Sequence, residues 1–353
     1  MLSGYCGYWT AYNAIKNGEC DPDNTSLMLF QTCGACRATN YINVLRMALK
    51  DAGYPQIPVF ACWGLETDAF SPTRENLIDS IKSVVYGDVL MNVRNRCLPY
   101  EVEPGATESL YRKWMELAKE ELADGSYNKF SRNIRNIIKD FEALPIHEDM
   151  WKPKVGIVGE ILVKYHPLAN NNLEQVLIEE GAEVVMPDFM DFFMYCAYDP
   201  IVKRRLLDGG LKSKLVAQAF IGLMDFYRRP VRKAMKNSRR FLPPHKIQAV
   251  ADMAERHVSL GNMAGEGWFL TGEMVKLIEN GVPNVVCLQP FGCLPNHITG
   301  KGVVHDLRRH YKEANILAID CDAGASEVNQ LNRIKLMLSV AKDKARNTDR
   351  VKA

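Results

Sequence analysis

The sequence predicts an α/β protein with parallel sheets, and three observations support that fold class. Short apolar runs that suit buried strands alternate with longer segments in which apolar residues recur at helical spacing. This alternation occurs in two blocks, within residues 26–62 and 154–342, with helical segments between and inside them. In the first block a strand, a helix and a strand follow directly, and such a β-α-β unit places its two strands in parallel.

The β-α-β unit follows a polar, turn-rich start. The apolar runs at 26–30 and 57–62 are expected to be its strands. Between them, residues 38–52 carry apolar side chains at helical spacing, and Gly53 and Pro55 mark the end of that helix. Because loops of such units lie at the carboxyl ends of the strands, the turn that enters the helix is a natural place for a functional site.

The middle of the chain is expected to be mainly helical. Residues 72–142 carry three apolar stripes at helical spacing, and the proline-containing segment 144–153 reads as a linker. We place the domain boundary there, which gives an N-terminal α/β domain of residues 1–150 with a helical extension and a C-terminal α/β domain of residues 151–353 with a helical insertion. A chain of 353 residues is long enough for two cores.

The second block repeats the alternation of strand and helix. Its expected strands are residues 154–159, 183–187, 284–289 and 316–320. Its expected helices are residues 170–180, 189–238, 266–280, 305–311 and 327–342. The polar residues from 346 onward are expected to fray.

Residues able to do chemistry follow several of these strand ends. They are Cys33, Cys36, Cys62, Glu160, Asp188, Cys293 and Asp322. Glu160 and Asp188 are candidate acid–base groups, although acids at strand ends often only cap helices. The loop 322–327 resembles an anion nest before a helix, so Ser326 joins Glu160 as a catalytic candidate. The histidines show no metal-spaced pair, and His297, close to Cys293, is expected to be structural.

Composition restricts the class of protein. Charged residues make up 24% of the chain and the net charge is +2, so neither nucleic acid nor a membrane is expected as a partner. No apolar run reaches the roughly 18 to 20 residues of a membrane helix, and no signal peptide is visible, so a cytoplasmic location is expected. Ten cysteines in such a protein are expected to be reduced, several as metal or cluster ligands and the others in the core.

The Cys33-Gly34-Ala35-Cys36 turn has several interpretations. A thioredoxin-like disulfide fits its position between strand and helix. A zinc site would need a second closely spaced pair of cysteines or a Cys/His pair, and the sequence has none. An iron–sulfur cluster needs thiolates from scattered positions, and Cys293, on a Gly-Cys-Leu-Pro turn, offers one. Two purely structural cysteines are the remaining interpretation.

A run of basic residues lies near the end of the long helical insertion. It comprises Arg228, Arg229, Arg232, Lys233, Lys236, Arg239 and Arg240, with no acid among them. Such a run is most often a solvated helix face. It could also hold the phosphates of a nucleotide or of coenzyme A, or an acidic partner surface.

Four separate stretches resemble the 2-hydroxyacyl-CoA dehydratase superfamily, and within it the branch associated with acyl-CoA dehydratase activases, which includes the double-cubane cluster proteins. The most specific is Leu-Gln-Pro-Phe-Gly-Cys-Leu-Pro-Asn-His-Ile at 288–298, followed by Gly-Lys-Gly at 300–302. The others are residues 32–41 with the CxxC-Arg pattern, 155–185 with Pro-Leu-Ala-Asn-Asn-Asn at 167–172, and 324–338.

The resemblance implies a fold and a chemistry. Family members hold cysteine-ligated 4Fe–4S clusters between two flavodoxin/Rossmann-like domains with inserted helices. A separate, ATP-hydrolysing activase delivers a low-potential electron. In dehydratases this electron reduces a 2-hydroxyacyl-CoA thioester to a ketyl radical, whereas double-cubane relatives reduce small molecules.

Residue by residue, the resemblance assigns ligands to this chain. Cys293 matches the ligand of the second domain, and Cys33 and Cys36 match the CxxC region of the first. Cys6 lies where a further N-terminal cysteine is expected, and Cys196 is a weaker candidate. The remaining cysteines, Cys20, Cys62, Cys97, Cys287 and Cys321, have no assignment. The resemblance does not decide between a single cubane with an open iron position and an 8Fe–9S double cubane.

These expectations combine into an oxygen-sensitive, cytoplasmic iron–sulfur reductase or dehydratase component. It would receive electrons from an ATP-dependent activase, take an acyl-CoA or a small molecule as substrate, and form a homodimer or heterodimer. No Walker motif is present, so the ATP-handling part is expected on another polypeptide or on another part of a longer chain. The alternatives are a thiol–disulfide oxidoreductase that uses Cys33 and Cys36, and a non-catalytic subunit that binds the activase.

Overall fold

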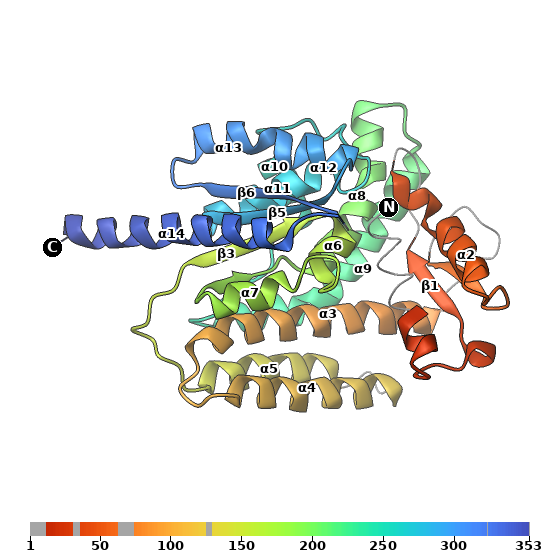
Figure 1. The fold of residues 1–353 in the computed structure, drawn as a ribbon, viewed down its shortest axis with the longest axis horizontal. Coiled ribbons are helices and arrows are strands. Elements are labelled where there is room, and N and C mark those ends of the chain that lie inside the picture. Colours follow the sequence, from red (N-terminus) through yellow and green to blue (C-terminus); the bar gives the residue numbers. More distant parts are fainter. Residues whose placement is uncertain (1–11, 31–35, 63–73, 125–128, 323, 353) are drawn as a thin grey trace.

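The computed structural model describes residues 12–30, 36–62, 74–124, 129–322 and 324–352. Within them the expected α/β class is confirmed, because two parallel sheets combine with many helices. The smaller sheet pairs β1 (Leu27–Phe30) with β2 (Val59–Cys62), and α2 (Tyr41–Asp51) connects them. Both strands overlap the expected ones, so the predicted β-α-β unit is present (Figure 1).

The larger sheet contains every strand expected in the second block. Its strands are β3 (Lys154–Gly159), β4 (Glu183–Val185), β5 (Asn284–Pro290) and β6 (Asn315–Cys321). They are ordered β4-β3-β5-β6, and all three pairings are parallel. The carboxyl ends of the four strands therefore lie along one edge of the sheet.

Helices make up most of the remaining structure. Before the larger sheet they are α3 (Arg74–Cys97), α4 (Ala106–Ala123) and α5 (Phe130–Ala143). Within and after it they are α6 (Ile161–Tyr165), α7 (Leu173–Glu179), α8 (Phe189–Leu206), α9 (Leu211–Lys236), α10 (Ile247–Glu255), α11 (Gly267–Glu279), α12 (Leu294–Thr299), α13 (Val304–His310) and α14 (Glu327–Lys352). No described helix is both long and apolar enough to cross a membrane.

Both faces of the larger sheet are covered. Val286 and Leu288 of β5 pack in one core with residues of α7 and α14, and the alternate residues Val285 and Cys287 pack in another with α11 and α13. Figure 1 shows α14 and α7 on one side of the sheet and α11 and α13 on the other. Burial on both faces explains why the sequences of these strands are continuous apolar runs.

A separate helical layer joins α3, α4 and α5 to α8, α9, α10 and the start of α11. Their buried side chains form one cluster that includes Trp114, Phe141 and Trp268. The smaller sheet has its own small core around Ile42, Leu49 and Val59 and lies beside the rest of the molecule in Figure 1. The domain boundary at residue 150 stays a prediction.

Two expected helices differ in extent from the observed ones. The segment 189–238 forms two helices, because Gly209 and Gly210 favour a break between α8 and α9. The last helix does not fray from residue 346 but continues to Lys352. Three helices of the second block, α6, α10 and α12, had no counterpart among the expected helices.

Candidate functional site

The carboxyl edge of the larger sheet brings together several of the predicted site residues. Glu160 directly follows β3, and its backbone N–H donates to Leu288 O of β5 (3.0 Å). The backbone N–H of Phe291, after β5, donates to Cys321 O at the end of β6 (2.9 Å). The loops after β3, β5 and β6 are therefore fixed to one another by backbone hydrogen bonds.

A tight turn after β5 holds Cys293. Gly292 has φ +72°, a conformation that a side chain would strain, and the Cys293 N–H donates to Pro290 O (3.0 Å). Cys293 is half-buried and immediately precedes α12. Burial raises the pKa of its thiol to about 11, although a hydrogen bond from Asn296 opposes that shift. Without a metal, the thiol is therefore protonated at neutral pH.

A buried amide and a buried carboxylate support this thiol. Asn296 is fully buried, and its Nδ2 donates both to Cys293 Sγ (3.0 Å) and to Glu266 Oε2 (2.8 Å). Glu266 also accepts from the N–H of Ile161 (3.2 Å), and burial raises its pKa. Asn296 Oδ1 has no hydrogen-bond partner among the described residues. The Asn296 side chain is thus held in the orientation that points its N–H groups at the sulfur.

Cys36, from the distant CxxC turn, lies against the same surface. A Cβ atom placed on Gly265 would lie 3.9 Å from Cys36 Sγ and 3.1 Å from Pro295 Cγ. Tyr195 of α8 fixes this loop, because its Oη donates to the carbonyls of Met263 and Gly265 (2.9 Å each). The Gly265 loop therefore lies against both Cys36 and Pro295, two residues after Cys293. That the two cysteines belong to one site stays a prediction.

The two catalytic candidates, Glu160 and Ser326, both have capping contacts. Glu160 is buried at the start of α6 and accepts from the N–H of Val163 (2.8 Å). Its charge is one of those that raise the pKa of Cys293, so it lies close to the thiol. Ser326 is exposed before α14, and its Oγ accepts from the N–H of Asn329 (3.4 Å). A catalytic role for either residue stays a prediction.

His297 has a structural environment. Its Nδ1 lies 2.8 Å from Cys293 O, and its Nε2 lies 3.4 Å from Asp320 Oδ1. Asp320 also binds Lys301 (3.0 Å), and these contacts lower the pKa of the aspartate despite its partial burial. His297 therefore ties the Cys293 turn to the end of β6.

Some predicted ligands cannot be placed. Cys6 and Cys33 lie outside the described residues, as does the side chain of Cys62. Cys196 is exposed on α8, next to the Tyr195 ring that fixes the Gly265 loop. Cys196 and Cys36 both lie near Tyr195, because a negative charge on either sulfur would raise the pKa of that tyrosine.

The cysteines that had no assignment are mostly core residues. Cys97, Cys287 and Cys321 are buried, and Cys20 is exposed. Burial raises the pKa of Cys97 to about 11 and that of Cys287 to about 12. These two thiols pack as small apolar side chains in the cores between helices and sheet.

The expected basic face near residue 228 needs a correction. Arg228 is 2% exposed and pairs with Asp191 (2.6 Å) and with Asp188. Arg232 pairs with Asp225 (2.9 Å), and Arg240 donates to the carbonyl of Leu144 (2.7 Å). Several cations of the run therefore have partners: Asp225 lies on the same helix, just before the run, and the partners of Arg228 come from the start of α8.

Buried ion pairs of α11 were not predicted. Lys164 pairs with Glu273 (2.8 Å), and both side chains are almost fully buried. Lys276 pairs with Asp191 (2.7 Å), which joins α11 to the pair formed by Asp191 with Arg228 of α9. The only feature of the sequence that pointed to these ion pairs was the presence of single charged residues among the apolar residues of a helix.

A second group could hold a metal ion. Ligand atoms of His257, Asp306 and His310 lie within 4.8 Å of one another, and His257 Nδ1 lies 2.7 Å from Asp306 Oδ2. Asp306 and His310 share one face of α13, but His257 comes from beyond α10, so spacing alone did not reveal the group. It precedes β6 and therefore lies toward the amino edge of the sheet, away from Cys293.

The site is thus a set of thiols and buried polar groups at the carboxyl edge of a parallel sheet. Searches with family models, against curated proteins and against solved structures found no match to the chain. The function proposed below therefore rests on the geometry of this edge.

Proposed function

We propose that the chain is an iron–sulfur protein of the 2-hydroxyacyl-CoA dehydratase type that accepts low-potential electrons from an ATP-dependent activase. The observation that carries the proposal is the approach of Cys36 and Cys293 to the same loop. Their sulfurs come from different sheets and from distant parts of the sequence. Distant thiols that meet at strand ends are the usual arrangement for a cluster ligated by scattered cysteines.

The proposed fold has two flavodoxin/Rossmann-like domains. The larger sheet, with helices on both faces, supports this assignment for the second domain. For the first domain, the smaller sheet provides one parallel β-α-β unit. The cluster would lie between the turn before α2 and the turn before α12.

The donor set suits a 4Fe–4S cluster. Cys36 and Cys293 would be two ligands, and Cys6 and Cys33 are proposed to complete the set, with Cys196 as a further candidate. A bound cluster would supply single-electron chemistry at low potential. The surrounding residues fit this role, because the Asn296 N–H group at Cys293 Sγ stabilises negative charge on the sulfur.

The binding of iron displaces a proton from each ligand thiol. The raised pKa of Cys293 makes the free thiolate rare, but ligation stabilises the thiolate directly and offsets that cost. The Asn296 amide and the restricted Cys293 turn hold the sulfur in place for ligation. Glu160 and Glu266 would be carboxylates close to the cluster ligand Cys293, and Ser326 would lie on the neighbouring loop.

Anaerobic purification tests the proposal. After reconstitution with iron and sulfide, the wild-type chain should contain both elements and show the absorption and paramagnetic resonance spectra of a 4Fe–4S cluster. Cys293→Ala should lower the iron content severalfold, and Cys36→Ala should do the same. Cys97→Ala, which removes a buried thiol of the helical layer, should leave iron unchanged.

Absence of iron from the reconstituted wild-type chain would overturn the proposal. A reversible two-electron thiol couple in that metal-free protein would instead support a thiol–disulfide oxidoreductase. Retention of a folded, colourless chain that still binds the activase would support a non-catalytic subunit.

A further inference from the structure

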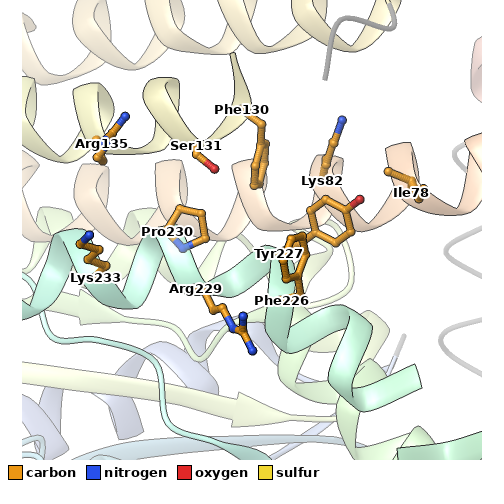
Figure 2. A pocket seen from close by; sticks show the side chains of 10 residues that line it. All are labelled: Ile78, Lys82, Phe130, Ser131, Arg135, Phe226, Tyr227, Arg229, Pro230 and Lys233. Carbon is orange, nitrogen blue, oxygen red and sulfur yellow. The ribbon is translucent and has the colours of Figure 1, made fainter. Parts of the chain in front are cut away.

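A large pocket opens in the helical layer, in a different part of the molecule from Cys293. It has a volume of about 790 Å³ and lies between α3, α5 and α9. Figure 2 shows its lining, with Phe130 and Arg135 from α5 facing Tyr227 and Lys233 from α9. None of its described lining residues belongs to the carboxyl edge of the sheet, so the pocket is separate from the proposed cluster site.

The charge of the lining is one-sided. It contains four cations, Lys82, Arg135, Arg229 and Lys233, and no described lining residue is an acid. Arg135 and Lys233 form no ion pair with any described residue, in contrast to Arg228 and Arg232 on the same helix α9. Two uncompensated cations on facing helices attract an anion, and their side chains are exposed enough to reach it.

Aromatic rings form the other part of the pocket. Phe130 is buried, and its ring meets that of Tyr227 edge to face, with the centroids 6.0 Å apart. Phe226 is 54% exposed beside them. Figure 2 places Arg135 and Lys233 toward one end and Phe130 and Tyr227 toward the middle. The lining therefore has two cations at one end and aromatic rings in the middle, with Lys82 beyond the rings.

A cation also borders the aromatic rings. Lys82 is buried, its Nζ lies 5.9 Å from the centroid of the Phe130 ring and 4.0 Å from Asp79 Oδ1. Burial lowers the pKa of Lys82, which reflects the cost of a charge in this position. A bound anion would offset that cost.

From this arrangement we propose that the pocket binds a nucleoside phosphate. The base would contact Phe130 and Tyr227, and the phosphates would bind Arg135 and Lys233. The volume lies within the range of roughly 300 to 1,000 Å³ that is usual for small-molecule sites. Arginine suits phosphate because its guanidinium can donate two parallel hydrogen bonds. The proposal goes beyond the iron–sulfur function and does not depend on it.

Calorimetric titration of the full chain with AMP and ATP tests the proposal, with adenosine and inorganic phosphate as partial ligands. We expect saturable binding of a nucleotide, at least tenfold tighter than that of either partial ligand. The double variant Arg135→Ala/Lys233→Ala should weaken nucleotide binding at least tenfold, and Tyr227→Ala should weaken it as well. Exposed residues can be replaced with little loss of stability, and circular dichroism would verify the fold of each variant.

Matched controls exist on the same helices. Arg132 of α5 and Lys236 of α9 are exposed cations that do not line the pocket. The double variant Arg132→Ala/Lys236→Ala should bind nucleotide like the wild type. An equal loss in both double variants would show nonspecific attraction and overturn the proposal. Tighter binding of phosphate alone, or no nucleotide binding at millimolar concentration, would also overturn it.

Discussion

At the scale of single residues, burial determines what the thiols of this chain can do. The pKa of Cys293 is about 11, so its free thiolate is rare at neutral pH. Thiol exchange benefits from a lowered pKa, whereas metal ligation can proceed from a thiol because the metal displaces the proton. The environment of Cys293 is therefore compatible with the ligand role that we propose for it, and it says nothing about thiol exchange at Cys33 and Cys36.

A buried carboxyl group next to the site gives a prediction for pH dependence. Burial raises the pKa of Asp199 on α8 to about 7, and its Oδ1 has no hydrogen-bond partner among the described residues. In the unfolded chain the pKa is about 3.9. At a pH between these two pKa values, the folded state binds more protons than the unfolded state. The contribution of Asp199 to stability therefore falls as the pH rises from about 4 to 7.

Asp199→Asn should remove this dependence. At pH 8 we expect its free energy of unfolding to exceed that of the wild type by on the order of 2 kcal/mol, because no charge is buried. At pH 4 the difference should nearly vanish. Urea unfolding across this range measures it, and Asp208→Asn, at an exposed carboxylate, is the control. A difference that is the same at pH 4 and pH 8 would contradict the argument.

At the scale of elements, strands were easier to predict than helix boundaries. Strands β3 and β5 are buried on both faces, and that burial produces the apolar runs that reveal them. The break between α8 and α9 is less visible, because both helices carry apolar side chains up to their ends. The signal was present in Gly209 and Gly210, which were read as part of one long helix.

The ion pairs that join helices could not be read from the local sequence. Arg228 lies in a basic run, yet its partners Asp188 and Asp191 come from another helix. Lys276 of a third helix shares Asp191. Such partners depend on tertiary packing, which periodicity alone does not give.

The Arg228 pair gives a prediction about helix packing. Arg228→Met should remove the ion pairs of Asp188 and Asp191 with the guanidinium, although Asp191 keeps its pair with Lys276. We expect the free energy of unfolding to fall by about 3–5 kcal/mol. Arg229→Met, at the next residue, changes an exposed side chain and should cost less than about 0.5 kcal/mol. Guanidinium unfolding of both variants measures the difference. Similar stability of the two would show that Arg228 behaves as part of a solvated face.

At the scale of the whole molecule, the sequence predicted the parts of the candidate site better than their arrangement. Cys36 and Cys293 were identified from their positions after strands. Their approach to one loop depends on Gly265, which carried no signal of its own, and on Pro295, which was interpreted only as part of the Gly-Cys-Leu-Pro turn. The group of His257, Asp306 and His310 was missed for the same reason, because its members meet only in the folded chain.

The contact through Gly265 provides a test of how the two sheets form one site. Gly265→Leu would place a side chain where Cys36 and Pro295 now lie, and so push the CxxC turn away from the Cys293 turn. We expect the variant to lose most of the iron that the wild type binds, although every cysteine is retained.

Gly281 supplies the matched control for that variant. Both glycines have positive φ, +60° for Gly265 and +79° for Gly281, so a leucine at either site strains the backbone, by about 1–2 kcal/mol. A side chain at Gly281 would meet no atom within 4 Å. Gly281→Leu should therefore lose similar stability but keep its iron. Equal iron content in the two variants would mean that the Gly265 contact does not hold the ligand turns together, whereas selective loss in Gly265→Leu would place Cys36 and Cys293 at one metal centre.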